Sequence, residues 1–321
     1  MNGTRYLLDT NAVIAIAKGN SELLARLNAA TYVAFSIISA IEFLAFPHLS
    51  KEDKDVLLRG LYSAKGQINL IYGYKPNRGD NEVLISGIRI NPKDLSVIGE
   101  VSLGSVKAKN QGLFSDVKFD PKSFVFDYSI DSSRFYLLTY PEQKKKDAKQ
   151  FSFTVFNADL SKVYGKDIEL DIQSRYAEIE STTLDQDGNF FIQRRTIPVE
   201  ITSAYIDKEH DKYIPEESIL THYSKTDMAG TDVKIGLTGK YIYQTKIVAN
   251  KGTNKLDIAG TYKNLEKGKI SGVFYCHYDP ATKKTDGLIS SEIAPDVLDA
   301  LADEKLAKSG GKDPGLSLAF T

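Results

Sequence analysis

Hydrophobic residues change their spacing along this chain near residue 60. Over residues 1–59 the apolar positions recur at helical spacing, and two short apolar runs have the length of strands. From Gly60 to about residue 290, short apolar runs alternate with polar positions and are separated by Gly, Pro, Asn and Asp. The pattern predicts a mixed fold: a short α/β segment followed by a mainly antiparallel β body.

The β body contains a recurring unit of strand, Asn or Asp turn, and strand. It occurs in "IRINPKDLSVIGE" around Asn91, in "TVFNADLSKVYGK" around Asn157 and in "FYCHYDPATKKTDG" around Asp279. A second unit places Asp131 and Asp185 at tight turns before aromatic strands. Repeated hairpins at this spacing favour an incomplete β-propeller over a sandwich.

The last stretch has a different pattern. "APDVLDALADEKLAKSGG" predicts one short amphipathic helix that begins at Pro295-Asp296 and ends at Gly310-Gly311. We therefore divide the chain into an α/β segment at 1–59, a β body at 60–293, and a helix with a tail at 294–321.

Composition adds little to this picture. The 41 basic and 42 acidic residues nearly cancel, so no global positive field indicates nucleic-acid binding. The single cysteine, Cys276, excludes an internal disulfide framework and a multi-cysteine zinc site. Asp9 and Asn11 interrupt the first apolar run, and "YVAFSIISAIEFLAF" is too short and too polar to span a bilayer. We expect no membrane segment and a cytoplasmic location.

Candidate chemistry begins with "RYLLDTNAVIAIAKGN", where an apolar strand runs into Asp9 and Asn11 and then into a helix. An aspartate in this place either caps the helix or holds a cation. A second strand and helix follow in "SIISAIEF", which carries Ser36 and Glu42.

These two motifs, in this order and spacing, resemble the front half of PIN-domain ribonucleases of the VapC toxin type. The resemblance covers roughly the first 58 residues. It implies that Asp9 and Glu42 are catalytic carboxylates that hold Mg²⁺ or Mn²⁺, with Asn11 and Ser36 as supporting polar groups. It further implies an RNA substrate, an antitoxin partner and, if the site is active, a Mg²⁺-dependent endoribonuclease.

The PIN-type pattern is incomplete in this chain. Such a site needs further acids from a later helix and strand, and "RGDNEVLISG" with Asp80 has the pattern of a strand instead. Two carboxylates bind Mg²⁺ weakly, so we predict a catalytically incomplete site unless Asp80 or Asp94 completes it.

The β body, with "GKYIY" and the "GVFY" hairpin, resembles β-propeller proteins common in Bacteroidetes. That resemblance implies a platform for a protein or ligand partner and no catalytic residues. Three interpretations stay open: a PIN-like segment joined to a binding platform, a non-catalytic interaction or scaffold protein with an N-terminal structural cap, and an artificial joining of two coding pieces.

The remaining motifs indicate structure more than chemistry. The histidines show no metal-binding spacing and suit surface or turn positions. Cys276 lies in an aromatic strand as a buried bystander. "LDQDGNFF" fits a β-turn better than a calcium loop, and "QKKKDAKQ" fits a solvated loop. The four histidines are His48, His210, His222 and His277.

Overall fold

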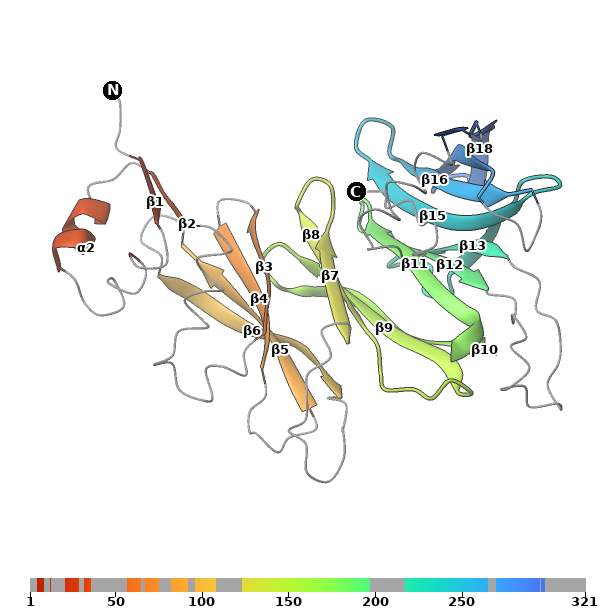
Figure 1. Cartoon of the computed structure of the whole chain (residues 1–321). Helices are drawn as coiled ribbons and strands as arrows, with labels where there is room; N and C mark the ends of the chain where they lie inside the picture. Colours follow the sequence, from red (N-terminus) through yellow and green to blue (C-terminus); the bar gives the residue numbers. More distant parts are fainter. Residues whose placement is uncertain are drawn as a thin grey trace, which may run out of the picture. The chain divides into compact units, whose positions relative to one another are not determined.

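The computed structural model consists mainly of β-strands (Figure 1). The described residues are 5–8, 12, 21–28, 32–35, 57–64, 67–74, 82–91, 96–107, 123–196, 217–264, 270–294 and 296–297. The predicted C-terminal helix lies almost entirely outside these ranges.

The N-terminal part contains one small sheet and one helix. Strand β1 (Arg5–Leu8) pairs in parallel with β2 (Tyr32–Phe35), and helix α2 (Ser21–Asn28) lies between them in the chain. An ion pair of 2.6 Å joins Arg26 to Glu22 one helical turn away. These elements do not support the predicted PIN-like α/β segment, because so little of residues 1–59 is described.

The rest of the described chain forms four antiparallel sheets, each of four strands that follow one another in sequence. The first sheet contains β3 (Leu57–Ala64), β4 (Gln67–Tyr74), β5 (Glu82–Ile90) and β6 (Val97–Lys107). The second contains β7 (Phe124–Tyr128), β8 (Arg134–Thr139), β9 (Ala148–Asn157) and β10 (Lys162–Gln173). The third contains β11 (Ala177–Leu184), β12 (Phe190–Thr196), β13 (Ser218–Tyr223) and β14 (Thr231–Ile235), after a short 3₁₀ turn η2 (Ser174–Tyr176). The fourth contains β15 (Tyr241–Asn250), β16 (Lys255–Lys263), β17 (Gly272–Asp279) and β18 (Lys284–Glu292).

Short polar side chains close the hairpins, as the turn residues in the sequence predicted. Asp131 accepts hydrogen bonds from the backbone and hydroxyl of Ser133, and Asp279 accepts one from the backbone of Ala281. The carboxylate of Asp185 accepts bonds from two backbone N–H groups of its turn at 2.9 and 2.8 Å. Each of these turns lets the chain reverse without leaving its own N–H groups unpaired.

The described chain divides into two compact units. The first contains Met1–Phe126 together with the short pieces Thr139–Glu142 and Ala158–Ser161. Its buried residues include the apolar Ile71, Ile85 and Phe124, which are fully buried. The boundaries predicted at 59/60 and 293/294 stay predictions.

The second unit contains Asp127–Leu138, Gln143–Asn157 and Lys162–Thr321. Its middle layer is sheet β11–β14, because neighbouring residues of β12 pack in opposite directions. Phe190 packs against Phe153 of β9 at 4.4 Å between ring centroids, whereas Phe191 joins the core shared with sheet β15–β18. Side chains alternate across a strand, so a sheet with both faces covered needs apolar residues on both.

The predicted antiparallel β body is therefore confirmed, whereas the predicted propeller is not. The described strands form separate four-stranded sheets and no closed propeller. Within the ranges that the structure describes, no helix has the length and apolar character needed to cross a membrane.

Candidate functional site

The residues predicted for metal chemistry cannot be placed. Asp9, Asn11, Ser36 and Glu42 all lie outside the described residues. So do the acids considered for completing that site, which are Asp80 and Asp94. Among the residues that are described, no group of three or more His, Cys, Asp or Glu side chains could hold a metal ion.

The weaker motifs behave as the sequence indicated, apart from two histidines. Cys276 is 1% exposed, and burial raises the pKa of its thiol to about 11, so it is an inert core residue. The "LDQDGNFF" stretch is a hairpin turn, and residues 140–147 form the loop that holds the three lysines. One of them is His222, which is 6% exposed within strand β13 and not at the surface. The other is His277, which belongs to a polar cluster of sheet β15–β18.

This cluster arises from the register of the last sheet. Asp257 of β16 lies directly opposite His277 of β17, and His277 lies opposite Asp286 of β18. Tyr275 is two residues before His277 and therefore shares its face of the sheet. Phe274 and Cys276, on either side of Tyr275 in the chain, point into the core. Alternation thus leaves the polar row on the outer face.

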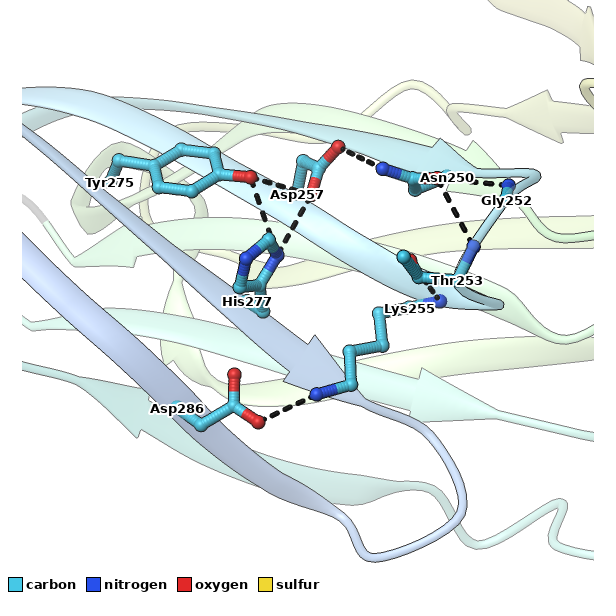
Figure 2. Close-up of polar contacts among 8 residues, drawn as sticks. All are labelled: Asn250, Gly252, Thr253, Lys255, Asp257, Tyr275, His277 and Asp286. Carbon is cyan, nitrogen blue, oxygen red and sulfur yellow. Dashed lines mark hydrogen bonds and ion pairs between the residues drawn. The ribbon is translucent and has the colours of Figure 1, made fainter.

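The Asp257 carboxylate is the centre of the cluster (Figure 2). Its Oδ1 lies 2.9 Å from Nδ1 of His277 and accepts a hydrogen bond of 2.8 Å from the hydroxyl of Tyr275. Its Oδ2 accepts a bond of 2.8 Å from the side-chain amide of Asn250. The Asn250 side chain is itself fixed, because its Oδ1 accepts from the backbone of Gly252 in the β15–β16 turn.

These contacts set the charge of the cluster. Burial by itself raises the pKa of Asp257, but hydrogen bonds from Asn250, Tyr275 and His277 outweigh burial and lower the pKa below its usual value. The hydrogen bond to Asp257 raises the pKa of Tyr275, so the phenol keeps its proton. Asp257 is therefore ionised and acts as an acceptor toward both neighbours.

An ionised carboxylate beside Nδ1 places the imidazole proton on that nitrogen. Nε2 of a neutral His277 then carries the lone pair and can accept a hydrogen bond or a proton. The ring packs over Gly287, where an added Cβ would lie 3.2 Å from Cδ2. Gly287 has a φ of +63°, in the left-handed region, at the irregular pairing between β17 and β18.

A charged pair and apolar side chains border the cluster. Lys255 and Asp286 form an ion pair of 2.7 Å. Val248 lies opposite Asp257 and is 48% exposed, and Ile289 lies opposite Tyr275 and is 65% exposed. The arrangement combines one oriented acceptor nitrogen with apolar contact area.

Known proteins offer little help with this site. No family model and no curated protein matches the chain significantly. Similar solved structures include a cobalt-substituted Synechocystis apocarotenoid oxygenase, with 6% identity, a TM-score of 0.36, and coverage of 75% of this chain and 50% of that one. A chimera of this oxygenase with RPE65 gives 7% identity, a TM-score of 0.38 and the same coverage. The chain thus spans about half the length of these structures, and likenesses this weak transfer no substrate, metal or activity.

The function predicted from the N-terminal motifs is nevertheless wrong on this comparison. The similar structures are apocarotenoid oxygenases, not PIN-type toxin ribonucleases. The Mg²⁺ or Mn²⁺ cofactor was implied only by the ribonuclease resemblance and is wrong with it. The RNA and antitoxin partners of the N-terminal segment stay predictions.

Proposed function

We propose that the chain binds an amphipathic ligand on the outer face of sheet β15–β18, and that the Asp257–His277 pair recognises a hydroxyl or amine of that ligand. The observation that carries the proposal is the 2.9 Å contact between Oδ1 of Asp257 and Nδ1 of His277. A carboxylate so placed fixes the tautomer and the orientation of the ring, which turns Nε2 into a directed acceptor.

The neighbouring side chains support an amphipathic ligand. Binding sites for small molecules are mostly apolar, with a few polar groups that set the orientation. Val248 and Ile289 supply exposed apolar surface beside the cluster. Tyr275 adds an aromatic ring whose centroid lies 4.9 Å from that of the His277 ring. The ligand expected here has an apolar body and at least one donor group.

A cytoplasmic location stays a prediction.

A fragment screen by NMR tests this proposal. The probes are small apolar alcohols and amines, and the signals followed are the ring resonances of His277 and Tyr275. We expect fragments that shift both sets of signals in the wild type, bind more weakly to Asp257→Asn and do not bind to His277→Gln. Lys246→Gln is the matched control, since Lys246 is an exposed polar residue of the same sheet.

Two results would overturn the proposal. The first is a screen in which no fragment perturbs His277. The second is unchanged binding to the folded His277→Gln protein. A ¹⁵N spectrum of the ring provides a check that needs no ligand: the proton must be on Nδ1 in the wild type, and Asp257→Asn must weaken that preference.

A further inference from the structure

A second polar cluster lies on the opposite face of sheet β15–β18, where that sheet packs against sheet β11–β14. Its side chains project from four strands and are almost completely enclosed. Gln193 is 0% exposed, Ser218 is 4% exposed and Thr245 is 5% exposed, and the side chain of Glu180 is 6% exposed. We call these four residues the buried polar layer.

Hydrogen bonds connect the buried polar layer from one sheet to the other. The amide of Gln193 donates to Oγ of Ser218 at 2.6 Å. The hydroxyls of Ser218 and Thr245 lie 3.3 Å apart. Thr245 in turn donates to the carboxylate of Glu180 from its hydroxyl and its backbone N–H. The four side chains therefore form one continuous network.

A bulge in β11 brings the carboxylate into this layer. The pairing of β11 with β12 shifts between Ile179 and Ser181, so Glu180 is the extra residue. The shift leaves Glu178 and Glu180 both facing Arg195, at 3.1 and 2.8 Å. Glu178 is 53% exposed and meets the guanidinium from the solvent side.

Two oxygens of the layer have no hydrogen-bond partner. They are Oε2 of Glu180 and Oε1 of Gln193, and both are buried. A buried acceptor without a donor costs about 1–3 kcal/mol, so native proteins rarely leave two in one network. Something that these side chains do not supply is required to satisfy them.

The charges around the layer identify the missing group. Two carboxylates and one guanidinium leave one negative charge when Glu180 is ionised. Arg195 lies over the ring of Tyr243 at 5.4 Å, and Lys263 lies over the same ring at 4.3 Å. Lys149 of β9 interacts with Glu178, at the outer carboxylate of the pair. The inner carboxylate has only Arg195 as a cationic neighbour among these groups.

We propose that the buried polar layer binds one small monovalent cation, Na⁺ or K⁺, through Oε2 of Glu180, Oε1 of Gln193 and the hydroxyl oxygens between them. All of these candidate ligands are oxygens, which suit a hard cation. A divalent ion is disfavoured, because Ca²⁺ takes six to eight oxygen ligands with several carboxylates, whereas the layer offers one carboxylate that is already beside Arg195. This cation site is separate from the proposed ligand-binding surface around His277, on the outer face of sheet β15–β18.

Thermal unfolding at pH 8 tests the proposal. Choline chloride is replaced stepwise by NaCl or KCl at constant ionic strength. A cation that binds only the folded chain, with a dissociation constant on the order of 10 mM, raises the folding equilibrium constant about 16-fold at about 150 mM. We expect this cation-specific rise in the wild type and none in Glu180→Gln.

Glu217→Gln is the matched control. It removes a carboxylate that directly precedes strand β13 in sheet β11–β14, the sheet that contains Glu180. The Glu217 carboxylate pairs with Lys234 outside the layer, so the cation effect must persist in this variant. If Glu180→Gln does not fold, anomalous scattering from wild-type crystals grown with Rb⁺ replaces it, and a peak between Glu180 and Gln193 is expected. Equal melting temperatures in choline, Na⁺ and K⁺ would overturn the proposal, as would a missing Rb⁺ peak where the melting assay shows a K⁺ effect, and a proton or water would then occupy the layer.

Discussion

The sharpest prediction about stability concerns the same carboxyl group, Glu180. Burial raises its pKa from 4.5 to about 7, with Arg195 lowering the pKa and Glu178 raising it. In the unfolded chain the carboxyl loses its proton near pH 4.5. Between pH 4.5 and pH 7 the folded chain therefore holds a proton that the unfolded chain has released, and stability falls as the pH rises through this window.

The size of the effect follows from the shift. Each pKa unit is worth about 1.4 kcal/mol, so a shift from 4.5 to about 7 removes about 3 kcal/mol of unfolding free energy by pH 8. The side chain is 6% exposed, so solvent screening does not reduce this figure much. Measurements in choline buffer prevent Na⁺ or K⁺ from competing with the proton.

A second buried group acts in the opposite direction. Burial lowers the pKa of His222 from 6.5 to about 4, with Lys283 lowering it further and Asp227 raising it. The folded chain keeps this imidazole neutral while the unfolded chain protonates it, so stability is present above pH 6.5 and is lost as the pH falls toward 4. The two slopes nearly cancel between pH 4.5 and 6.5 in the wild type.

Urea unfolding at pH 5, 6, 7 and 8 separates the two groups. Tyrosine fluorescence reports unfolding, because the chain has 18 Tyr and no Trp. We expect a shallow profile in the wild type. In Glu180→Gln we expect a profile that rises with pH, since only the His222 slope remains. Parallel profiles for the two proteins would refute the buried, proton-binding state of Glu180.

Three further predictions concern packing, turns and the thiol. A Cβ at Gly260 would lie 2.5 Å from Cε1 of Phe274, so Gly260→Ala should lower the unfolding free energy by about 1–3 kcal/mol. Gly236→Ala is the control and should not lower it, because no atom lies within 4 Å of a Cβ at Gly236. Urea unfolding midpoints measure the difference, and equal midpoints for the two variants would contradict the close packing. Asp185→Ala should cost about 1–3 kcal/mol, because it removes the buried acceptor of its turn, and a loss below that range in the same assay would argue against that role. Cys276 should react with iodoacetamide only after urea unfolds the chain, and labelling of the native chain would show an accessible thiol.

The sequence predicts the sheets because their signals are local. Period-two alternation marks the strands, and Asp131, Asp185 and Asp279 mark the turns, where each side chain bonds backbone only two residues away. The closing of the sheets into a propeller is not local. It depends on how whole sheets pack, and the spacing of the hairpins carries no information about that.

The ligand face could be found only in part. The stretch "FYCHYD" shows by alternation that Tyr275 and His277 share one face, and this was the signal available. Their partner Asp257 is 20 residues before His277 in the chain, and the two meet only because β16 and β17 pair in one register. A shift of one residue would turn Asp257 into the core. A histidine without a nearby metal-binding partner therefore looked like an ordinary surface residue.

The direction of the Glu180 side chain does not follow from alternation along the sequence, because it depends on the bulge in β11. Strand β13, in the middle layer of the second unit, connects the buried polar layer to a second buried titratable group. It carries Ser218 of the buried polar layer at one end and His222 four residues later, about 13 Å along the strand. His222 bonds the hydroxyl of Tyr278 through Nδ1 and leaves Nε2 buried without a partner. The interface between sheets β11–β14 and β15–β18 thus contains the Glu180 carboxyl, whose pKa is raised, and the His222 imidazole, whose pKa is lowered. Since burial keeps His222 neutral and about 13 Å separates it from Ser218 of the layer, we expect cation binding at Glu180 to stabilise the sheets without changing the neutral charge of His222.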